Sequence, residues 1–177
     1  SQNVRAQCDS SQRSRWQDNG ECVVKVLFLH GMEARPGGFK AQFLEKHGFD
    51  LLNPGLPDES MSDSISIAQN ALDLNHPEVV VGSSRGAAVA MGIESGEARL
   101  VLIAPAWRFC AIDPLVKPAT TILHSPHDEL IPLADSRHLV EANELPPSAL
   151  IEVGESHRMN DEAALAALLQ AVHGQLR

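Results

Sequence analysis

Hydrophobic residues in this chain fall into short continuous runs, such as "VVKVLFL" at 23–29, "EVVV" at 78–81 and "ARLVLIAP" at 98–105. Runs that continue instead of alternating with polar residues are typical of strands buried on both faces of a parallel sheet. Turn-forming residues bound most of them. The pattern predicts strands at 23–29, within 49–57, and at 78–81, 98–105, 119–126 and 148–154.

Between these runs, apolar residues recur every three to four positions, which is typical of amphipathic helices. Phe39, Phe43 and Leu44 show this spacing before a stop at Gly48. Strands that alternate with helices predict an α/β fold, here an open, mostly parallel sheet of about six strands with helices on both faces. The helices are expected within 35–48, 62–75, 84–96, 133–143 and 159–176.

The first 21 residues differ from the rest, because they are polar, rich in Ser, Gln and Arg, and show no period. We expect an N-terminal extension over 1–21 and one α/β domain over 22–177. A chain of 177 residues is long enough for one domain with a sizeable core.

Composition narrows the classes of partner. The net charge is −9 and no Lys/Arg cluster stands out, which argues against nucleic acid or an anionic membrane as a partner. No apolar run approaches the roughly 18 residues that span a bilayer. Three cysteines without a C-x-x-C, and His and Asp residues that are scattered, indicate neither a disulfide framework nor a metal site. We expect a cytoplasmic protein, and the sequence leaves its oligomeric state open.

The segment "EVVVGSSRGAAVAM" runs from a predicted strand into a predicted helix through Gly-Ser-Ser-Arg-Gly. Ser84 is the centre of a G-x-S-x-G, the pattern of a sharp turn that exposes a serine nucleophile. Gly82 and Gly86 leave room for that turn, since a Cβ at either position would crowd the neighbouring strand or helix. Ser84 is the candidate nucleophile; a purely structural turn serine, and Ser83 as the nucleophile, are the alternatives.

A serine nucleophile needs a general base, usually a histidine that a carboxylate orients. Asp128 comes just after one predicted strand and His157 just after the last one. Because the carboxyl ends of parallel strands meet at one edge of the sheet, both side chains should lie near Ser84. Glu129 stays open as the carboxylate, with Asp128 then a helix cap.

These segments resemble the α/β-hydrolase superfamily, from about residue 24 to the end of the chain. The loop "HGMEARPGGFKAQFL" and the "PGLP" segment are similar to small, cap-less bacterial esterases. The resemblance implies a minimal α/β-hydrolase fold without a large cap, and catalytic roles for Ser84, Asp128 and His157. Its motifs are "FLHG" at 28–31, "VVGSSRG" at 80–86, "HSPHDELIP" at 124–132 and "GESHRM" at 154–159.

The resemblance also implies an oxyanion hole formed by the backbone N–H groups of Met32 and Arg85. Three side chains are candidates for substrate contact. The Arg85 side chain would either attract an anionic substrate group or point away, Trp107 would either line the pocket or cover the edge of the sheet, and His30 would either contact substrate or stabilise its loop. His124 and His127 are expected to be structural.

We therefore expect a serine hydrolase that cleaves a carboxylic ester or thioester of a small or medium acyl group through an acyl-enzyme on Ser84. Its partner is a small-molecule substrate, and it needs no metal or organic cofactor. An acyltransferase or a peptidase with the same residues, and a non-catalytic hydrolase-like binding protein, stay open. The turn "GSSRGA" lacks the Walker lysine and G-x-G-x-x-G, which argues against nucleotide binding.

Overall fold

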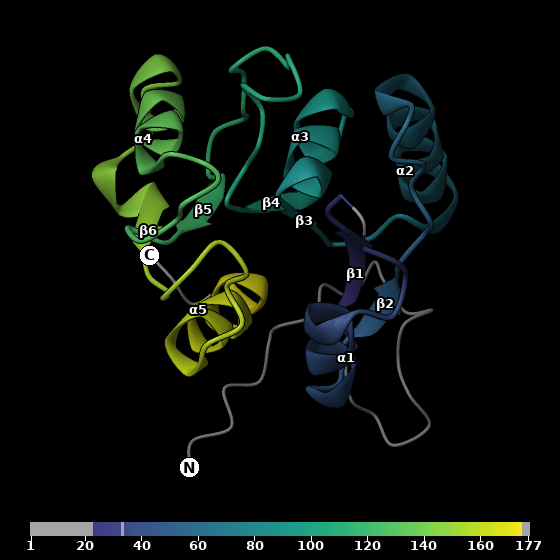
Figure 1. Cartoon of the computed structure of the whole chain (residues 1–177). Helices are drawn as coiled ribbons and strands as arrows, with labels where there is room; N and C mark the ends of the chain where they lie inside the picture. The colour runs from purple at the N-terminus through teal and green to yellow at the C-terminus, as the bar shows by residue number, and fades with distance from the viewer. Residues whose placement is uncertain (1–22, 33, 175–177) are drawn as a thin grey trace.

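The computed structural model describes residues 23–32 and 34–174. The extension predicted for 1–21 lies outside these residues. Within them, six parallel strands form one sheet in the order β2-β1-β3-β4-β5-β6, which confirms the predicted parallel sheet (Figure 1). The strands are β1 (Lys25–Leu29), β2 (Asp50–Leu52), β3 (Val79–Ser83), β4 (Arg99–Ile103), β5 (Thr121–His124) and β6 (Leu150–Glu152).

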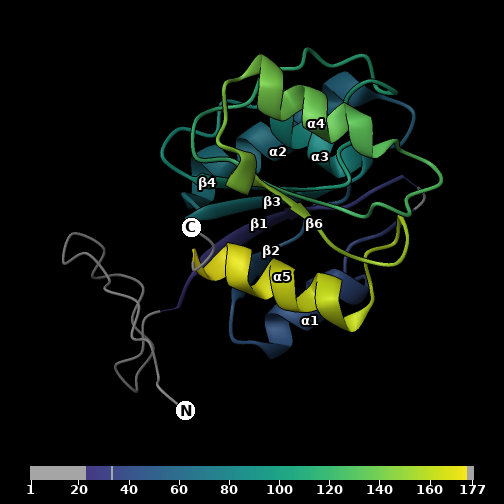
Figure 2. The same cartoon turned by 90° about the vertical axis from the view of Figure 1, so that its left-hand side faces the viewer.

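Helices cover both faces of the sheet, as predicted. Helices α1 and α5 lie on one face and α2, α3 and α4 on the other (Figure 2). Their bounds are α1 (Phe39–Lys46), α2 (Met61–Asn75), α3 (Arg85–Gly92), α4 (Leu133–Ala142) and α5 (Glu162–His173), with a short 3-10 turn at Pro147–Ala149.

The two helical layers explain the continuous apolar runs of the central strands. Val79 and Val81 pack into the core cluster that contains α1 and α5, while Val80 packs into the cluster that contains α2, α3 and α4. All three are completely buried, so both faces of β3 need apolar side chains. The edge strands β2 and β6 are shorter and only partly buried.

Local signals set the helix ends. The Ser60 hydroxyl accepts a hydrogen bond from the Asp63 N–H at the start of α2, and the Asp161 carboxylate accepts one from the Ala164 N–H at the start of α5. Phe39 departs from its expected place in the helical apolar pattern. It is the first residue of α1 and 58% exposed, because it faces the cavity described below and not the core.

The strand order places the carboxyl ends of the central strands at a topological switch point. From β1 the chain moves outward to β2, returns to β3 on the other side of β1, and continues in that direction to β6. In open α/β sheets, sites form in the crevice at such a point. In the part of the chain that the structure describes, no helix is long and apolar enough to cross a membrane.

Candidate active site

Ser84 occupies a strained turn between β3 and α3. Its backbone has φ 56° and ψ −114°, a conformation that residues with a side chain rarely adopt. This turn places Ser84 at the carboxyl end of β3, directly before the first residue of α3. Such a turn makes the serine hydroxyl project from the end of the sheet.

The two flanking glycines are required by close backbone packing, as the sequence predicted. A Cβ on Gly82 would come within 2.5 Å of the Gly86 carbonyl oxygen and 2.6 Å of the Ala87 Cα. A Cβ on Gly86 would overlap the carbonyl group of Leu29 in β1. The missing side chain at Gly82 therefore lets the end of β3 approach the start of α3, and the missing side chain at Gly86 lets α3 approach the end of β1.

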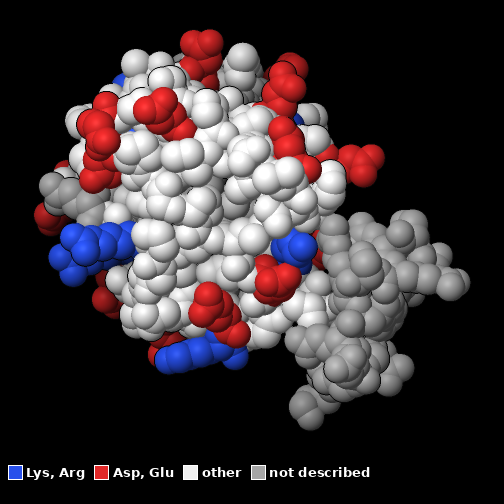
Figure 3. Space-filling model, turned by 90° about the vertical axis from the view of Figure 1, so that its right-hand side faces the viewer, with Lys and Arg blue, Asp and Glu red and all other residues white. Residues whose placement is uncertain are grey.

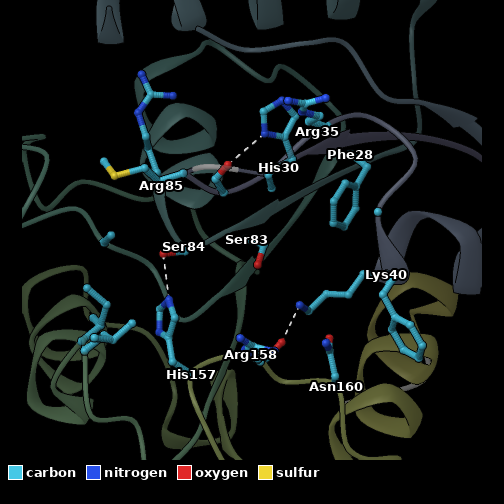
Figure 4. Close-up of a pocket in the computed structure, with 18 of the residues that line it drawn as sticks. Phe28, His30, Arg35, Lys40, Ser83, Ser84, Arg85, His157, Arg158 and Asn160 are labelled. Atoms are coloured by element: carbon cyan, nitrogen blue, oxygen red, sulfur yellow. Dashed lines mark hydrogen bonds between the residues drawn. The ribbon is translucent and has the colours of Figure 1, made fainter. Parts of the chain in front are cut away.

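The structure brings the three predicted catalytic residues together in one chain of hydrogen bonds. The Ser84 Oγ lies 3.0 Å from Nε2 of His157 (Figure 4). Nδ1 of His157 lies 2.7 Å from Oδ2 of Asp128. A carboxylate only accepts hydrogen bonds, so Nδ1 carries the proton and Nε2 is free to accept from the serine hydroxyl. His157 is thus in the tautomer that a general base requires.

Asp128 is the fixed end of this chain. Its side chain is fully buried, and its Oδ1 accepts hydrogen bonds from the N–H groups of Leu130 and Ile131, each at 2.8 Å. Burial alone would raise the carboxyl pKa, but the bonds from Ile131, His157 and Leu130 outweigh it and lower the pKa below its ordinary value. Asp128 is therefore ionised at neutral pH. It does not cap α4, which begins at Leu133.

A second histidine lies behind the carboxylate, and the sequence did not indicate its contact. His124, the last residue of β5, is fully buried with Nε2 3.1 Å from Asp128 Oδ2 and 2.9 Å from the Ile131 carbonyl oxygen. Its Nδ1 lies 2.6 Å from the Ser136 hydroxyl. Burial lowers the His124 pKa despite these acceptors, so the ring is neutral, donates from Nε2 and accepts from Ser136.

The site opens into a cavity of about 730 Å³. Its wall comes from the loops that follow five of the strands, so segments far apart in the sequence meet there. Met32 and Arg85, the two residues predicted to supply backbone donors, both border it. The Arg85 N–H begins α3 and has no acceptor inside the helix. A Cβ on Gly31 would lie 3.5 Å from the Ser84 Cβ, so the Gly31–Met32 backbone runs beside the serine.

Neither the Arg85 side chain nor Trp107 is placed to contact a substrate at Ser84: Arg85 follows the alternative of pointing away, and Trp107 does not border the cavity. The Arg85 side chain is 3% exposed and turns away from Ser84 (Figure 4). It donates to the Pro57 carbonyl oxygen at 2.8 Å and to the Ser64 hydroxyl at 3.1 Å. It ties the loop before α2 to the turn. Trp107 is buried in the core on the α4 side and donates to the Asp135 carbonyl oxygen. Its neighbour Phe109 borders the cavity instead.

His30 borders the cavity but makes only loop contacts. Its Nδ1 donates to the Gly31 carbonyl oxygen at 2.9 Å, and its Nε2 accepts from the Leu56 N–H at 3.0 Å. This is the loop-stabilising alternative of the sequence prediction. Ser83 also borders the cavity, but no hydrogen bond joins its hydroxyl to a described histidine. Among described residues, no group of three or more His, Cys, Asp or Glu side chains has a metal-binding arrangement.

Comparison with solved structures identifies the fold. A protein from Xanthomonas campestris pv. campestris assigned to the alpha/beta hydrolase superfamily is 24% identical, with a TM-score of 0.66 over 86% of this chain and 96% of that one. The alpha/beta hydrolase domain-containing protein 10 from mouse is 16% identical, with a TM-score of 0.68 over 85% and 88% of the two chains. Est1E from Butyrivibrio proteoclasticus is 13% identical, with a TM-score of 0.61 over 86% of each chain.

The chain therefore has the α/β-hydrolase fold, in a small form without a large cap. No family model matches the sequence, and no curated protein matches it. The likeness to these structures is one of fold.

Proposed function

We propose that this protein is a serine hydrolase that cleaves a carboxylic ester or thioester of a small or medium acyl group. The observation that carries the proposal is the continuous hydrogen-bonded chain from Ser84 through His157 to the buried Asp128, beside a cavity. A structural serine would not need a strained backbone, a correctly oriented histidine and a buried carboxylate in series.

In the first half-reaction, Ser84 Oγ attacks the carbonyl carbon of the substrate while its proton passes to His157 Nε2. The bond from this carbon to the alcohol oxygen or thiol sulfur then breaks, and His157 returns the proton to the leaving group. In the second half-reaction, His157 takes a proton from water, whose oxygen attacks the acyl carbon. The bond from this carbon to Ser84 Oγ then breaks, the acid leaves, and His157 returns the proton to Ser84. Atoms and protons balance without a metal or organic cofactor.

The N–H groups of Met32 and Arg85 are the proposed donors to the oxyanion of each tetrahedral intermediate. Both residues border the cavity beside Ser84. The Arg85 N–H also stands at the positive end of the α3 dipole, which favours negative charge there. One such donor contributes about 3 kcal/mol to the stability of the transition state.

Hydrolysis of a panel of p-nitrophenyl esters and acyl-thioesters tests the proposal. The wild-type protein should hydrolyse at least one short-chain member, and Ser84→Ala and His157→Ala should lose that activity. Ser83→Ala is the matched control and should keep it, because its hydroxyl has no histidine partner among the described residues. Activity retained in folded Ser84→Ala, or no hydrolysis by the folded wild type, would overturn the proposal.

A further inference from the structure

The wall of the cavity carries a cluster of positive charge that the proposed chemistry does not use. Arg35 from the loop after β1, Lys40 in the first turn of α1 and Arg158 from the loop before α5 all border the cavity. The fold brings all three to one cavity, with Arg35 near His30 and Lys40 beside the Arg158 backbone (Figure 4). No Asp or Glu among the described residues borders it.

This cluster stands out because the molecule as a whole is acidic. The chain has 23 acidic and 14 basic residues. Acidic side chains are spread over the face shown in Figure 3, where basic ones are isolated. A protein with this net charge repels anions at a distance, so a local excess of cations in the cavity makes that region selectively attractive to them.

Lys40 is the most constrained of the three cations. It is half-buried, and its ammonium donates to the Arg158 carbonyl oxygen at 2.5 Å (Figure 4). Burial lowers the Lys40 pKa to about 8, and no described carboxylate forms an ion pair with it. An ammonium has three N–H donors, so further acceptors can be bound. A partly desolvated cation is stabilised by an anion placed next to it.

Arg158 and Arg35 are two further exposed cations that border the same cavity. Neither forms an ion pair with a carboxylate of the described residues, where the two arginine–carboxylate pairs are Arg108–Asp135 and Arg137–Glu152. Figure 4 places Lys40 and the Arg158 backbone beside each other, across the cavity from Ser84. A substrate bound at Ser84 therefore lies in the cavity that both residues border.

We propose that the substrate carries a negatively charged group, which Lys40 and Arg158 bind while Arg35 adds to the positive potential. This inference deepens the proposed hydrolase function and rests on it. It assigns substrate recognition to Lys40 and Arg158 in place of Arg85, whose side chain is buried elsewhere. The charge can stand on the acyl part or on the alcohol part of the ester, and the experiment below distinguishes the two.

Two matched pairs of esters test this inference. The first compares the mono-p-nitrophenyl ester of adipic acid with p-nitrophenyl hexanoate, so that only the end of the acyl chain differs. The second compares the butyrate esters of 4-hydroxybenzoate and of its methyl ester, so that only the leaving group differs in charge. In at least one pair the charged ester should have the higher kcat/KM, by about tenfold at low ionic strength.

Lys40→Met and Arg158→Gln should each reduce that ratio of charged to neutral kcat/KM by about fivefold, and Lys40→Arg should restore most of it. Added salt should lower the ratio for wild type toward that of the variants, since it screens the attraction. Lys46→Met is the matched control, because Lys46 is exposed at the other end of α1 and does not border the cavity. It should leave the ratio unchanged. The ratio is the readout because lost packing or a loosened loop affects both esters alike.

A wild-type protein that hydrolyses the neutral esters at least as well as the charged ones in both pairs would overturn the inference and leave the proposed function standing. A ratio above one that Lys40→Met and Arg158→Gln leave unchanged would overturn the assignment to these residues. Failure on all four esters, with no labelling of Ser84 by a fluorophosphonate, would overturn the proposed function itself.

Discussion

The two sides of the Ser84 hydroxyl are built in opposite ways. On the Asp128 side, each polar atom has a partner: the buried carboxylate receives hydrogen bonds from Leu130, Ile131 and His157, with His124 behind it. On the cavity side, Arg35 and Arg158 are exposed and Lys40 is half-buried. The Asp128 side consists of short, buried side chains whose polar atoms are all hydrogen-bonded within the protein. The cavity side consists of long side chains around an open space.

This difference separates two tasks. A general base must be held in one tautomer and orientation, and a buried carboxylate with fixed donors provides that. The wall of a binding site must bind a ligand, so its hydrogen-bond donors cannot all be used by acceptors within the protein. Substitutions on the Asp128 side should therefore reduce turnover of every substrate, whereas those on the cation side should change the choice among substrates.

The largest effect is expected at Ser84 itself. Ser84→Ala removes the proposed nucleophile and should lower kcat by about 10⁵-fold, with little loss of stability because the side chain is small. Steady-state rates on the best ester of the panel, with circular dichroism as the check on folding, measure this. If the alanine variant kept more than a tenth of the activity, the Asp128 side would not be catalytic. The proposed difference between the two sides of Ser84 would then be wrong.

The next largest effect on kcat is expected for Asp128→Asn. An amide at this position no longer stabilises a protonated His157 or fixes its tautomer, so kcat should fall by about 10³- to 10⁴-fold for charged and neutral esters alike. Glu129→Gln is the control, since Glu129 is exposed and adjacent in sequence. Equal losses in the two variants would mean that net charge near the site, and not the orientation of His157, is responsible.

Gly86→Ala tests the backbone contact that forms the turn. The added Cβ would overlap the Leu29 carbonyl group, so the variant should lose about 3 kcal/mol of unfolding free energy. Gly55→Ala is the matched control, because its Cβ would lie at an ordinary 3.8 Å from Pro36 Cγ. Thermal denaturation followed by circular dichroism compares the two, and a shift of similar size in both would show that the turn does not need this glycine.

His124→Gln should have a smaller effect on turnover. His124 does not touch the cavity and acts through Asp128, so it is a positioning residue, and kcat should fall about tenfold with KM little changed. The pH profile of kcat should also move, because a flexible amide does not hold the Asp128 carboxylate as the fixed imidazole of His124 does. His127→Gln alters an exposed neighbour and should change neither. A rise in KM without a fall in kcat would contradict the positioning role.

The smallest effect concerns stability and pH. The unfolded chain takes up a proton on His124 near its ordinary pKa of about 6.5, while the folded protein, with the His124 pKa lowered, does not. The unfolding free energy should therefore fall as the pH drops below about 6.5, by up to about 1.4 kcal/mol per pH unit. Denaturant unfolding at pH 7 and pH 5 measures this slope, which His124→Gln should flatten. His173, whose pKa burial also lowers, provides the comparison variant His173→Gln.

The sequence was most informative where backbone geometry dictates residue type. The continuous apolar runs predicted the central strands best, because each of these faces a helical layer on both sides, as Val79, Val80 and Val81 show. The G-x-S-x-G predicted the turn at Ser84, since only glycine fits the contacts at Gly82 and Gly86. The predicted strand ends gave the positions of Asp128 and His157, because the carboxyl ends of parallel strands lie at the same edge of the sheet.

Side-chain direction was much harder to predict. Arg85 is adjacent to Ser84 in sequence, yet the first turn of α3 carries its side chain away to Pro57 and Ser64. Trp107 enters the core on the α4 side although Phe109, two residues later, borders the cavity. The Lys40–Arg158 neighbourhood and the His124–Asp128 contact depend on how separate loops pack, and no short motif encodes that.

The central claim, that His157 and Asp128 activate Ser84, is tested most directly by reaction with a fluorophosphonate followed by intact mass measurement and peptide mapping. We expect one label per molecule on Ser84 in the wild-type protein, none in Ser84→Ala, and much slower labelling in folded His157→Ala. A folded wild-type protein that takes up no label, or one labelled at Ser83 instead, would contradict it.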